Sequence, residues 1–307
     1  MIYILYITST LALALYYASA TLIRLRRRRR IARLRHNYIL EITAASLPKA
    51  QTALPRATSR HERIALLEAL HTITSHSYDI DSALIHSIAR ANRLEGFILR
   101  RLDSLPPHRR GEYLLFLGII SASERHAPML ERTMHSDNPH LRSCALVALL
   151  SISPKDAITT LSAVEFDLRP FDIMQIILLL RRGALPLAIE PLLESQNPNL
   201  NRLGLAIVRT FGLNIVAAHI YDLAARSPHL RVVDDAILTL ATLKCSLHRQ
   251  PIRQRLATMS TPQRKALCRH LSVEGYSPQR LQNLFPQTES EYATRFITSY
   301  KRELAHT

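Results

Sequence analysis

Apolar residues recur at helical spacing behind a series of prolines that stand about thirty residues apart. The stretch from Asn138 to Leu149 shows the unit: its Asn-Pro turn fixes φ for a first helical position, and apolar residues follow at positions 141, 145, 148 and 149. The same register returns at intervals of 32, 31, 28, 30 and 34 residues, at Pro107, Pro139, Pro170, Pro198, Pro228 and Pro262. The pattern predicts a repeated unit in which each proline begins a short amphipathic helix.

The residues that follow these prolines are of similar type from one unit to the next. The ninth residue is apolar in all six units: Phe116, Ala148, Leu179, Ile207, Ile237 and Leu271. Near the ends of four of the helices stands a glycine, where we expect a left-handed residue to close the helix: Gly118, Gly183, Gly212 and Gly275. The first five of the six proline-led helices are each preceded by a further helical segment, expected at 95–104, 123–135, 155–165, 184–195 and 214–226. The chain is therefore predicted to be a succession of helix pairs.

Pro-x-apolar-Arg followed by small and apolar residues resembles the second helix of HEAT or HEAT-like repeats. The resemblance covers roughly residues 95–275 and is strongest at 137–150 and 197–244. The period is shorter than the 40 or so residues of a typical HEAT repeat, so compact HEAT-like repeats fit better. A tetratricopeptide array competes on length alone but its Trp, Gly and Tyr signature is missing, and Ser227-Pro228-His229-Leu230 only faintly echoes an ankyrin motif. The resemblance implies an all-α fold, a right-handed α-solenoid of HEAT-like helix pairs with an extended binding surface.

Residues 1–23 contain no charged side chain and are mostly Ile, Leu, Ala and Tyr. As a helix they would be about 34 Å long, enough for a hydrocarbon core of about 30 Å, so we expect one transmembrane helix. A cleaved signal peptide is the alternative, because Ala18-Ser19-Ala20 has the form of a cleavage site, but no positive region precedes the apolar run. The expected organisation is a transmembrane helix (1–23), a polybasic juxtamembrane helix and linker (24–60), and a solenoid with capping helices at both ends (61–307).

The net charge of +16 is unevenly distributed. Eight arginines with no acid among them follow the apolar segment directly: Arg24, Arg26, Arg27, Arg28, Arg29, Arg30, Arg33 and Arg35. Under the positive-inside rule this run stays in the cytoplasm, which predicts a single-pass protein of the inner membrane with its N-terminus outside and its solenoid in the cytosol. The run would also attract anionic lipids, at about 1 kcal/mol per basic residue. A specific site for a nucleic acid or a lipid headgroup is the sharper hypothesis, but the neighbouring sequence supplies no aromatic platform or groove for it.

Composition and motifs argue against intrinsic chemistry. Seven glycines and the absence of tryptophan suit helix pairs better than a sheet, and three scattered cysteines, Cys144, Cys245 and Cys268, suggest reduced, buried side chains. The chain has no glycine-rich phosphate loop, no His-Glu-x-x-His, no Gly-x-Ser-x-Gly and no Cys-x-x-Cys, and its fourteen histidines are dispersed. We therefore expect no catalytic residue, no cofactor and no metal.

Two sets of charged residues are candidates for binding a partner. The first lies three residues after four of the prolines and would form a ladder on successive repeats: Arg110, Arg142, Arg231 and Lys265. In HEAT-like arrays such an arginine commonly pairs with a loop acid of a neighbouring repeat, a role for which Asp137 is placed. The second set is Asp234, at a position that is small or apolar in most repeats, with its neighbour Asp235. Because a buried unpaired carboxylate is costly, Asp234 either meets an arginine or faces a groove.

Three hypotheses for function follow. The first is a membrane-anchored cytosolic scaffold that holds a partner protein, itself membrane-associated, on its second-helix surface. The second is a lyase or chromophore-attachment factor, since some short HEAT-like families resemble lyases acting on bilin pigments and others are DNA glycosylases. The third is a nucleic-acid-binding protein, which requires the basic residues outside 24–35 to cluster on one face. We favour the scaffold, with anionic lipids as further contacts and no nucleic-acid partner.

Overall fold

The computed structural model describes residues 2–47, 54–77, 81–121, 123–181, 183 and 188–305. The chain is all-α and 78% helical, and the described residues contain no strand. The predicted fold class is thus confirmed at the level of helices.

The first half of the chain contains a long N-terminal helix followed by short ones. They are α1 (Ile2–Ala45), α2 (Arg60–His76), α3 (Ser82–Ala91), α4 (Leu94–Leu102), α5 (Pro107–Ile120), η1 (Glu124–His126), α6 (Ala127–Met134), α7 (Pro139–Ile152) and η2 (Pro154–Asp156). The second half continues with α8 (Ala157–Ser162), α9 (Pro170–Arg181), α10 (Glu190–Glu194), α11 (Pro198–Phe211), η3 (Asn214–Val216), α12 (Ala217–Arg226), α13 (Leu230–Thr242), α14 (Gln250–Thr258), α15 (Thr261–Val273), α16 (Pro278–Gln282) and α17 (Gln287–Ala305).

The chain divides into two compact units. Unit 1 comprises Met1–Ala157 and Leu178–Leu185, and unit 2 comprises Ile158–Ile177 and Pro186–Thr307. Each has its own packed helices and is described by itself.

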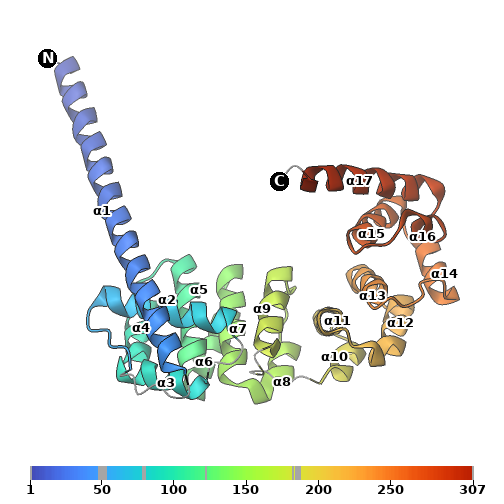
Figure 1. Cartoon of the computed structure of the whole chain (residues 1–307), viewed down its shortest axis with the longest axis horizontal. Coiled ribbons are helices and arrows are strands. Elements are labelled where there is room, and N and C mark those ends of the chain that lie inside the picture. Colours follow the sequence, from blue (N-terminus) through green and yellow to red (C-terminus); the bar gives the residue numbers. More distant parts are fainter. Residues whose placement is uncertain are drawn as a thin grey trace. The chain divides into compact units, whose positions relative to one another are not determined.

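In unit 1 the helices pack on their neighbours in the chain. α2 contacts α1 and α5, α4 contacts α5, and α7 contacts both α5 and α6 (Figure 1). Because α5 and α6 cover two sides of α7, ten of its 14 residues are buried. The expectation of an amphipathic helix here is therefore wrong: α7 is apolar nearly all round, as a helix in the centre of a core must be.

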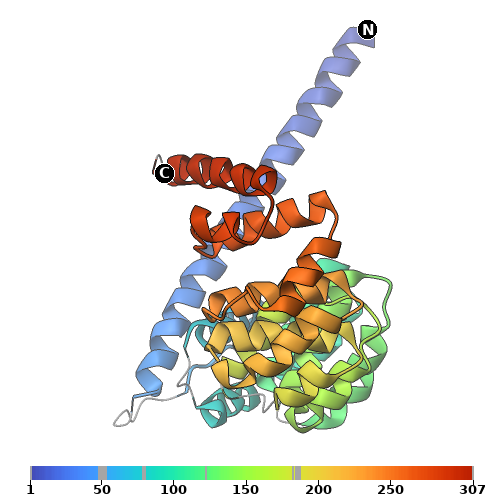
Figure 2. The same ribbon diagram turned by 90° about the vertical axis from the view of Figure 1, so that its right-hand side faces the viewer.

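Unit 2 repeats the same contacts with different helices. α11 packs against α10 and α13, α12 packs against α13 and α14, and α15 packs against α13 and α17 (Figure 2). One continuous apolar cluster, from Leu193 to Ala293, joins these helices. In α10 to α13 each first helix thus contacts its own second helix, and successive second helices contact each other. This alternation is compatible with a helical-repeat array.

Five of the six prolines begin a helix as predicted. Pro107, Pro139, Pro170 and Pro198 are the first residues of α5, α7, α9 and α11, and Pro262 is the second residue of α15. Asn138 supports the start of α7, since its Oδ1 accepts hydrogen bonds from the backbone N–H groups of His140 (3.0 Å) and Leu141 (3.2 Å). All six residues nine positions after the prolines are buried.

Pro228 departs from the pattern. α13 begins at Leu230, and Pro228 lies in the turn before it. The Oγ of Ser227 accepts a hydrogen bond from the N–H of His229 at 3.3 Å, and the carbonyl oxygen of His229 accepts the first helical bonds. This serine turn delays the helix by two residues, so the predicted start at Pro228 is wrong.

Three of the four glycines have the predicted left-handed conformation. Gly183, Gly212 and Gly275 have φ of 65°, 68° and 87°. Gly118 instead lies inside α5, where an added Cβ would be 2.7 Å from the Cα of Ala148. The prediction for Gly118 is wrong, because this glycine allows the backbones of α5 and α7 to approach closely.

The expected membrane span lies in the first half of α1. Among the described residues no single helix is both long and apolar enough to cross a bilayer, and only the bent pair Pro139–Ile152 and Pro154–Ser162 meets the criteria of length and composition. Met1 and the side chains of residues 2–5, 7–12 and 14, on which the expectation for 1–23 rests, lie outside the described residues.

Candidate functional site

The arginine run lies on α1 before the part of this helix that packs on the rest of unit 1. The side chains of residues 26–30, 33 and 35 are exposed, and the side chain of Arg24 lies outside the described residues. Further along, Tyr38 and Ile42 are buried, and the Tyr38 hydroxyl donates a hydrogen bond to the carbonyl oxygen of Arg56 at 3.0 Å. The predicted contact of the arginines with lipid remains a prediction.

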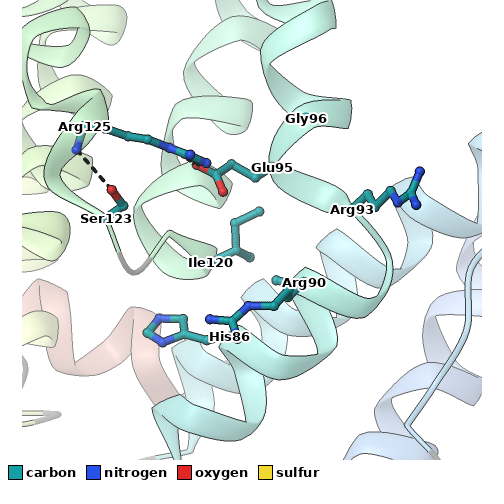
Figure 3. Close-up of a pocket in the computed structure, with 9 residues that line it drawn as sticks. His86, Arg90, Arg93, Glu95, Gly96, Ile120, Ser123 and Arg125 are labelled. Atoms are coloured by element: carbon teal, nitrogen blue, oxygen red, sulfur yellow. Dashed lines mark hydrogen bonds and ion pairs between the residues drawn. The ribbon is translucent and has the colours of Figure 1, made fainter.

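A pocket of about 480 Å³ opens in unit 1 between α3, the start of α4 and the turn before α6 (Figure 3). Its lining is mainly polar and basic: His86, Ala89, Arg90, Arg93, Glu95, Gly96, Ile120, Ser123 and Arg125. Arg93 sits in the tight turn between α3 and α4 with φ of 50°, a left-handed conformation that is uncommon for a residue with a side chain. The preceding Asn92 is buried and holds this turn, because its Oδ1 accepts a hydrogen bond from the N–H of Ala57 at 2.6 Å.

Glu95 is the acidic centre of this pocket. Its Oε1 accepts hydrogen bonds from Nη2 of Arg125 at 2.5 Å and from Nε2 of His126. Burial alone would raise the pKa of Glu95, but the hydrogen bonds from Arg125 and His126 outweigh it and lower that pKa. Figure 3 shows Arg125 reaching across the pocket toward Glu95. The single acid is therefore ionised and already engaged by two basic side chains.

The remaining side chains leave the pocket with an excess of positive charge. Arg90 lies next to the ring of His86 (Figure 3), and burial followed by the charge of Arg90 lowers the pKa of His86. The Ser123 hydroxyl accepts a hydrogen bond from the N–H of Arg125 at 3.4 Å. No nucleophile is paired with a base among these groups. The arrangement suits the binding of a carboxylate or another small anion, and not covalent chemistry.

The ladder residues of unit 1 are part of its framework. Nη2 of Arg110 donates to the carbonyl oxygens of Asp103 (3.3 Å) and Leu105 (3.4 Å), just after the C-terminal end of α4. Arg142 is half-buried in the first turn of α7. Asp137, the expected loop acid, forms no hydrogen bond or ion pair within the described part of the chain. For Arg110 the structure thus favours a role in satisfying helix-end carbonyls.

In unit 2 the two carboxylates of α13 have different surroundings. Oδ2 of Asp235 lies 3.0 Å from Nε of Arg202, whose Nη1 donates to the carbonyl oxygen of Leu168 at 3.1 Å. Asp234 is half-buried and forms no hydrogen bond or ion pair with any residue that the structure describes. Burial, followed by the charge of Asp235, raises the pKa of Asp234 to about 6. The arginine expected for Asp234 therefore pairs with its neighbour.

The other two ladder residues also have partners in unit 2. Nη1 of Arg231 lies 2.9 Å from Oδ2 of Asp167, an acid in the loop before α9, and both side chains are 73% exposed. Nζ of Lys265 lies 5.6 Å from the ring centroid of Tyr292 on α17, within range of a cation–π interaction. Arg231 thus pairs with a loop acid, but this acid lies 64 residues away, about two repeats, and so not in the neighbouring repeat that was expected.

The predicted residues are divided between the two units. Arg110 and Arg142 belong to unit 1, whereas Arg231, Asp234, Asp235 and Lys265 belong to unit 2. The pocket around Glu95 was not predicted, because Arg125 lies thirty positions from Glu95 and the lining residues match no motif. Only the irregular break between α3 and α4 could have drawn attention to it.

The described residues include no group of three His, Cys, Asp or Glu side chains that could hold a metal ion. Cys144 and Cys268 are buried, as expected, and Cys245 is half-buried. Comparison of the chain with protein-family models, curated proteins and solved structures finds no match.

Proposed function

We propose that this chain is a membrane-attached scaffold, in which HEAT-like helix pairs form a right-handed α-solenoid that holds a partner protein without catalysis of its own. The succession of contacts among α10, α11, α12 and α13 supports the solenoid, because such arrays stack each pair on the next. The polar groups described above support binding by charge and shape in place of covalent chemistry.

The main observation in support of membrane attachment is the exposed apolar surface of α1. Leu13, Leu15, Tyr16, Tyr17 and Ile23 are each between 58% and 67% exposed. Exposed apolar surface that is contiguous marks a membrane or protein contact, since burial of such surface gains about 25 cal/mol per Å². The same helix continues without a break into the arginine run, so anionic headgroups would meet the arginines where the apolar segment ends.

The charge of the run supports one orientation. Arginines that follow the apolar segment favour an N-terminus outside and the rest of the chain, from the arginines onward, in the cytosol at the inner membrane. In this orientation Asp234 would be available to a basic group of a membrane-associated partner, because no described residue neutralises it.

Membrane attachment is tested by substitutions within α1 of the full-length chain. We expect Leu13→Asp with Leu15→Asp to release the protein from membranes washed at high pH, because each aspartate opposes insertion by about 3 kcal/mol. The matched control is Leu40→Asp, an exposed apolar position (57%) of the same helix beyond the arginines, which should leave the protein in the membrane fraction. A double variant that stays in the membrane fraction would refute the anchor.

The scaffold itself is tested by crosslinking and affinity capture from detergent-solubilised membranes of the native cells. We expect the wild-type chain to retain partners that the Leu13→Asp, Leu15→Asp variant loses. If the released variant recovers the same partners from the soluble extract, the membrane-complex part of the proposal is wrong while the binding surface stands. A reporter fused after Thr307 that is active only outside the cytoplasm would reverse the orientation.

A further inference from the structure

A second pocket of unit 1, of about 380 Å³, is more strongly basic than the one around Glu95. It lies between the first turn of α2 and the last turn of α4, and its lining residues are Arg60, Arg63, Phe97, Arg100, Arg101 and Ser104. Four of these six residues are arginines and none is acidic. We call this set the arginine pocket.

The aromatic ring of Phe97 organises the arginine pocket. The guanidinium carbon of Arg101 lies 5.2 Å from the ring centroid and that of Arg63 lies 5.8 Å from it. Nε of Arg63 also donates to the carbonyl oxygen of Ala57 at 3.4 Å. Cation–π contacts on a buried ring therefore hold two guanidinium groups from different helices at one place. The sequence beside the α1 arginines contains no aromatic platform, whereas the ring of Phe97 provides one in this pocket.

The described residues do not neutralise the positive charges of the arginine pocket. None of its four arginines forms an ion pair with a residue that the structure describes, and Nη1 of Arg101 is buried without a hydrogen-bond partner. Burial lowers the pKa of Arg101; Tyr113 opposes this, and the charges of Arg60, Arg27 and Arg109 add to the lowering. Arg60 also occupies the first residue of α2, where the helix dipole disfavours a cation. A bound anion would relieve both the repulsion and the unsatisfied donor.

The arginine run of α1 adjoins this pocket. Burial lowers the pKa of His61, and the nearby charges of Arg27 and Arg30 lower it further. The charge of Arg27 also contributes to the lowered pKa of Arg101. Figure 1 shows α1 passing beside α2, which it contacts. Arg27 is four residues beyond Ile23, or about 6 Å along the helix. With the apolar segment inserted, that distance lies within a headgroup layer of about 5–8 Å, so the arginine pocket would be level with the lipid phosphates.

We propose that the arginine pocket binds a phosphate group, supplied by the headgroup of an anionic lipid. Guanidinium forks match phosphate oxygens with paired hydrogen bonds, and four arginines line this pocket. The anion site stands on the geometry of α2 and α4 alone, whereas the lipid as its source rests on the proposed membrane attachment. A soluble phosphate ester is the alternative source.

The anion site is tested by calorimetric titration of the full-length chain in neutral detergent with glycerol 3-phosphate. We expect Arg101→Gln and Arg60→Gln each to weaken binding about tenfold or more, the loss expected for one charge-assisted hydrogen bond. The matched control is Arg132→Gln, an exposed arginine of α6 outside the pocket, which should change the affinity less than twofold. Arg60 is exposed, so its variant keeps the test valid if Arg101→Gln perturbs folding, which circular dichroism would reveal. Equal affinities for wild type and both pocket variants would overturn the site.

The source of the phosphate is tested by mass spectrometry of lipid retained after extraction from phosphatidylcholine vesicles containing phosphatidic acid. We expect wild type and Arg29→Gln, which removes one exposed arginine of the α1 run, to retain phosphatidic acid, and Arg101→Gln to lose at least fivefold of it. Equal losses in the two variants would show diffuse attraction and overturn the lipid as the ligand. The calorimetric titration does not require α1 to insert into a bilayer. Its result would therefore still hold if the proposed membrane anchor were refuted.

Discussion

The Nε atom of Arg202 lies 3.0 Å from Oδ2 of Asp235, and both side chains are largely shielded from solvent, with 14% and 27% of their surfaces exposed. The same guanidinium donates to the carbonyl oxygen of Leu168 at 3.1 Å. One arginine of α11 therefore ties α13 to the loop before α9 inside unit 2. Asp234, next in the chain to Asp235, has no such partner among the described residues.

Removing this arginine should destabilise the protein substantially. Arg202→Ala would leave the Asp235 carboxylate partly buried without its counter-charge and would free the Leu168 carbonyl. Loss of one partner from a shielded ion pair costs about 3 kcal/mol in the free energy of unfolding. Urea denaturation followed by circular dichroism at 222 nm measures the change.

Arg231→Ala is the matched control for that substitution. Arg231 also pairs with an aspartate in unit 2, but both partners are 73% exposed. Such exposed pairs contribute about 0–1 kcal/mol, so we expect a change below 1 kcal/mol. Equal losses for Arg202→Ala and Arg231→Ala would show that the first pair is not shielded as the structure indicates.

Neutralising Asp234 should have an effect of the opposite sign that depends on pH. The pKa of Asp234 is raised from 3.8 to about 6 in the folded protein. Well below pH 3.8 both states carry the proton and the group has no effect; between pH 3.8 and 6 the unfolded chain ionises first, so stability falls as pH rises. Asp234→Asn removes this fall, so it should stabilise the protein by about 1–3 kcal/mol at pH 8 and by much less, about 0.5 kcal/mol or below, at pH 4.

Asp235→Asn provides the comparison, since it removes the neighbouring charge but weakens the bond to Arg202. We expect it to destabilise at pH 8, where Asp234→Asn stabilises. Urea denaturation of both variants at pH 4 and pH 8 gives the four values needed. A destabilised Asp234→Asn at pH 8 would mean that the carboxylate has a partner that the structure does not contain.

The contrast between these two residues shows what the sequence could and could not predict. The proline register and the buried ninth positions follow from local rules, because proline fixes φ and the helical period decides which residues share a face. The sequence also has an acid, Asp234, at a position that is small or apolar in most other repeats. Which of two adjacent carboxylates meets an arginine depends on Arg202, 33 residues away, and on a rotation of about 100° per residue around α13.

The two basic pockets of unit 1 were unpredictable for a related reason. Arg60 and Arg63 lie on a different helix from Arg100 and Arg101, about forty residues away, and Phe97 joins them only when α2 and α4 are folded. No spacing rule connects such positions. The prediction that Gly118 ends a helix is wrong, because the sequence does not distinguish a glycine at a helix end from a glycine where two helices cross.

Gly118→Ala should destabilise the protein. Its Cβ would lie 2.7 Å from Cα and 3.2 Å from the carbonyl oxygen of Ala148, which are backbone atoms that cannot turn away. Separating α5 from α7 to admit the methyl group costs about 1–3 kcal/mol. Gly96→Ala in α4 is the control, because a Cβ there has no heavy atom within 4 Å and alanine is the better helix former. We expect Gly96→Ala to raise the free energy of unfolding by about 0.5–1 kcal/mol. Thermal unfolding should therefore show a lower melting temperature for Gly118→Ala and a higher one for Gly96→Ala.

The three cysteines should differ in reactivity toward a thiol reagent at pH 8. Burial, followed by the charge of Glu289, raises the pKa of Cys268 to about 12, so its thiolate is scarce, and both Cys268 and Cys144 are buried. Cys245 is half-buried near the end of α13 and is the accessible thiol. We expect one thiol to react with Ellman's reagent within minutes in the native protein and three in 8 M urea. Because buried thiols react only when their helices open, Cys245→Ser should abolish the fast phase and leave the slow one unchanged. Three thiols reacting at one rate in the native chain would contradict the burial of α7 and α15.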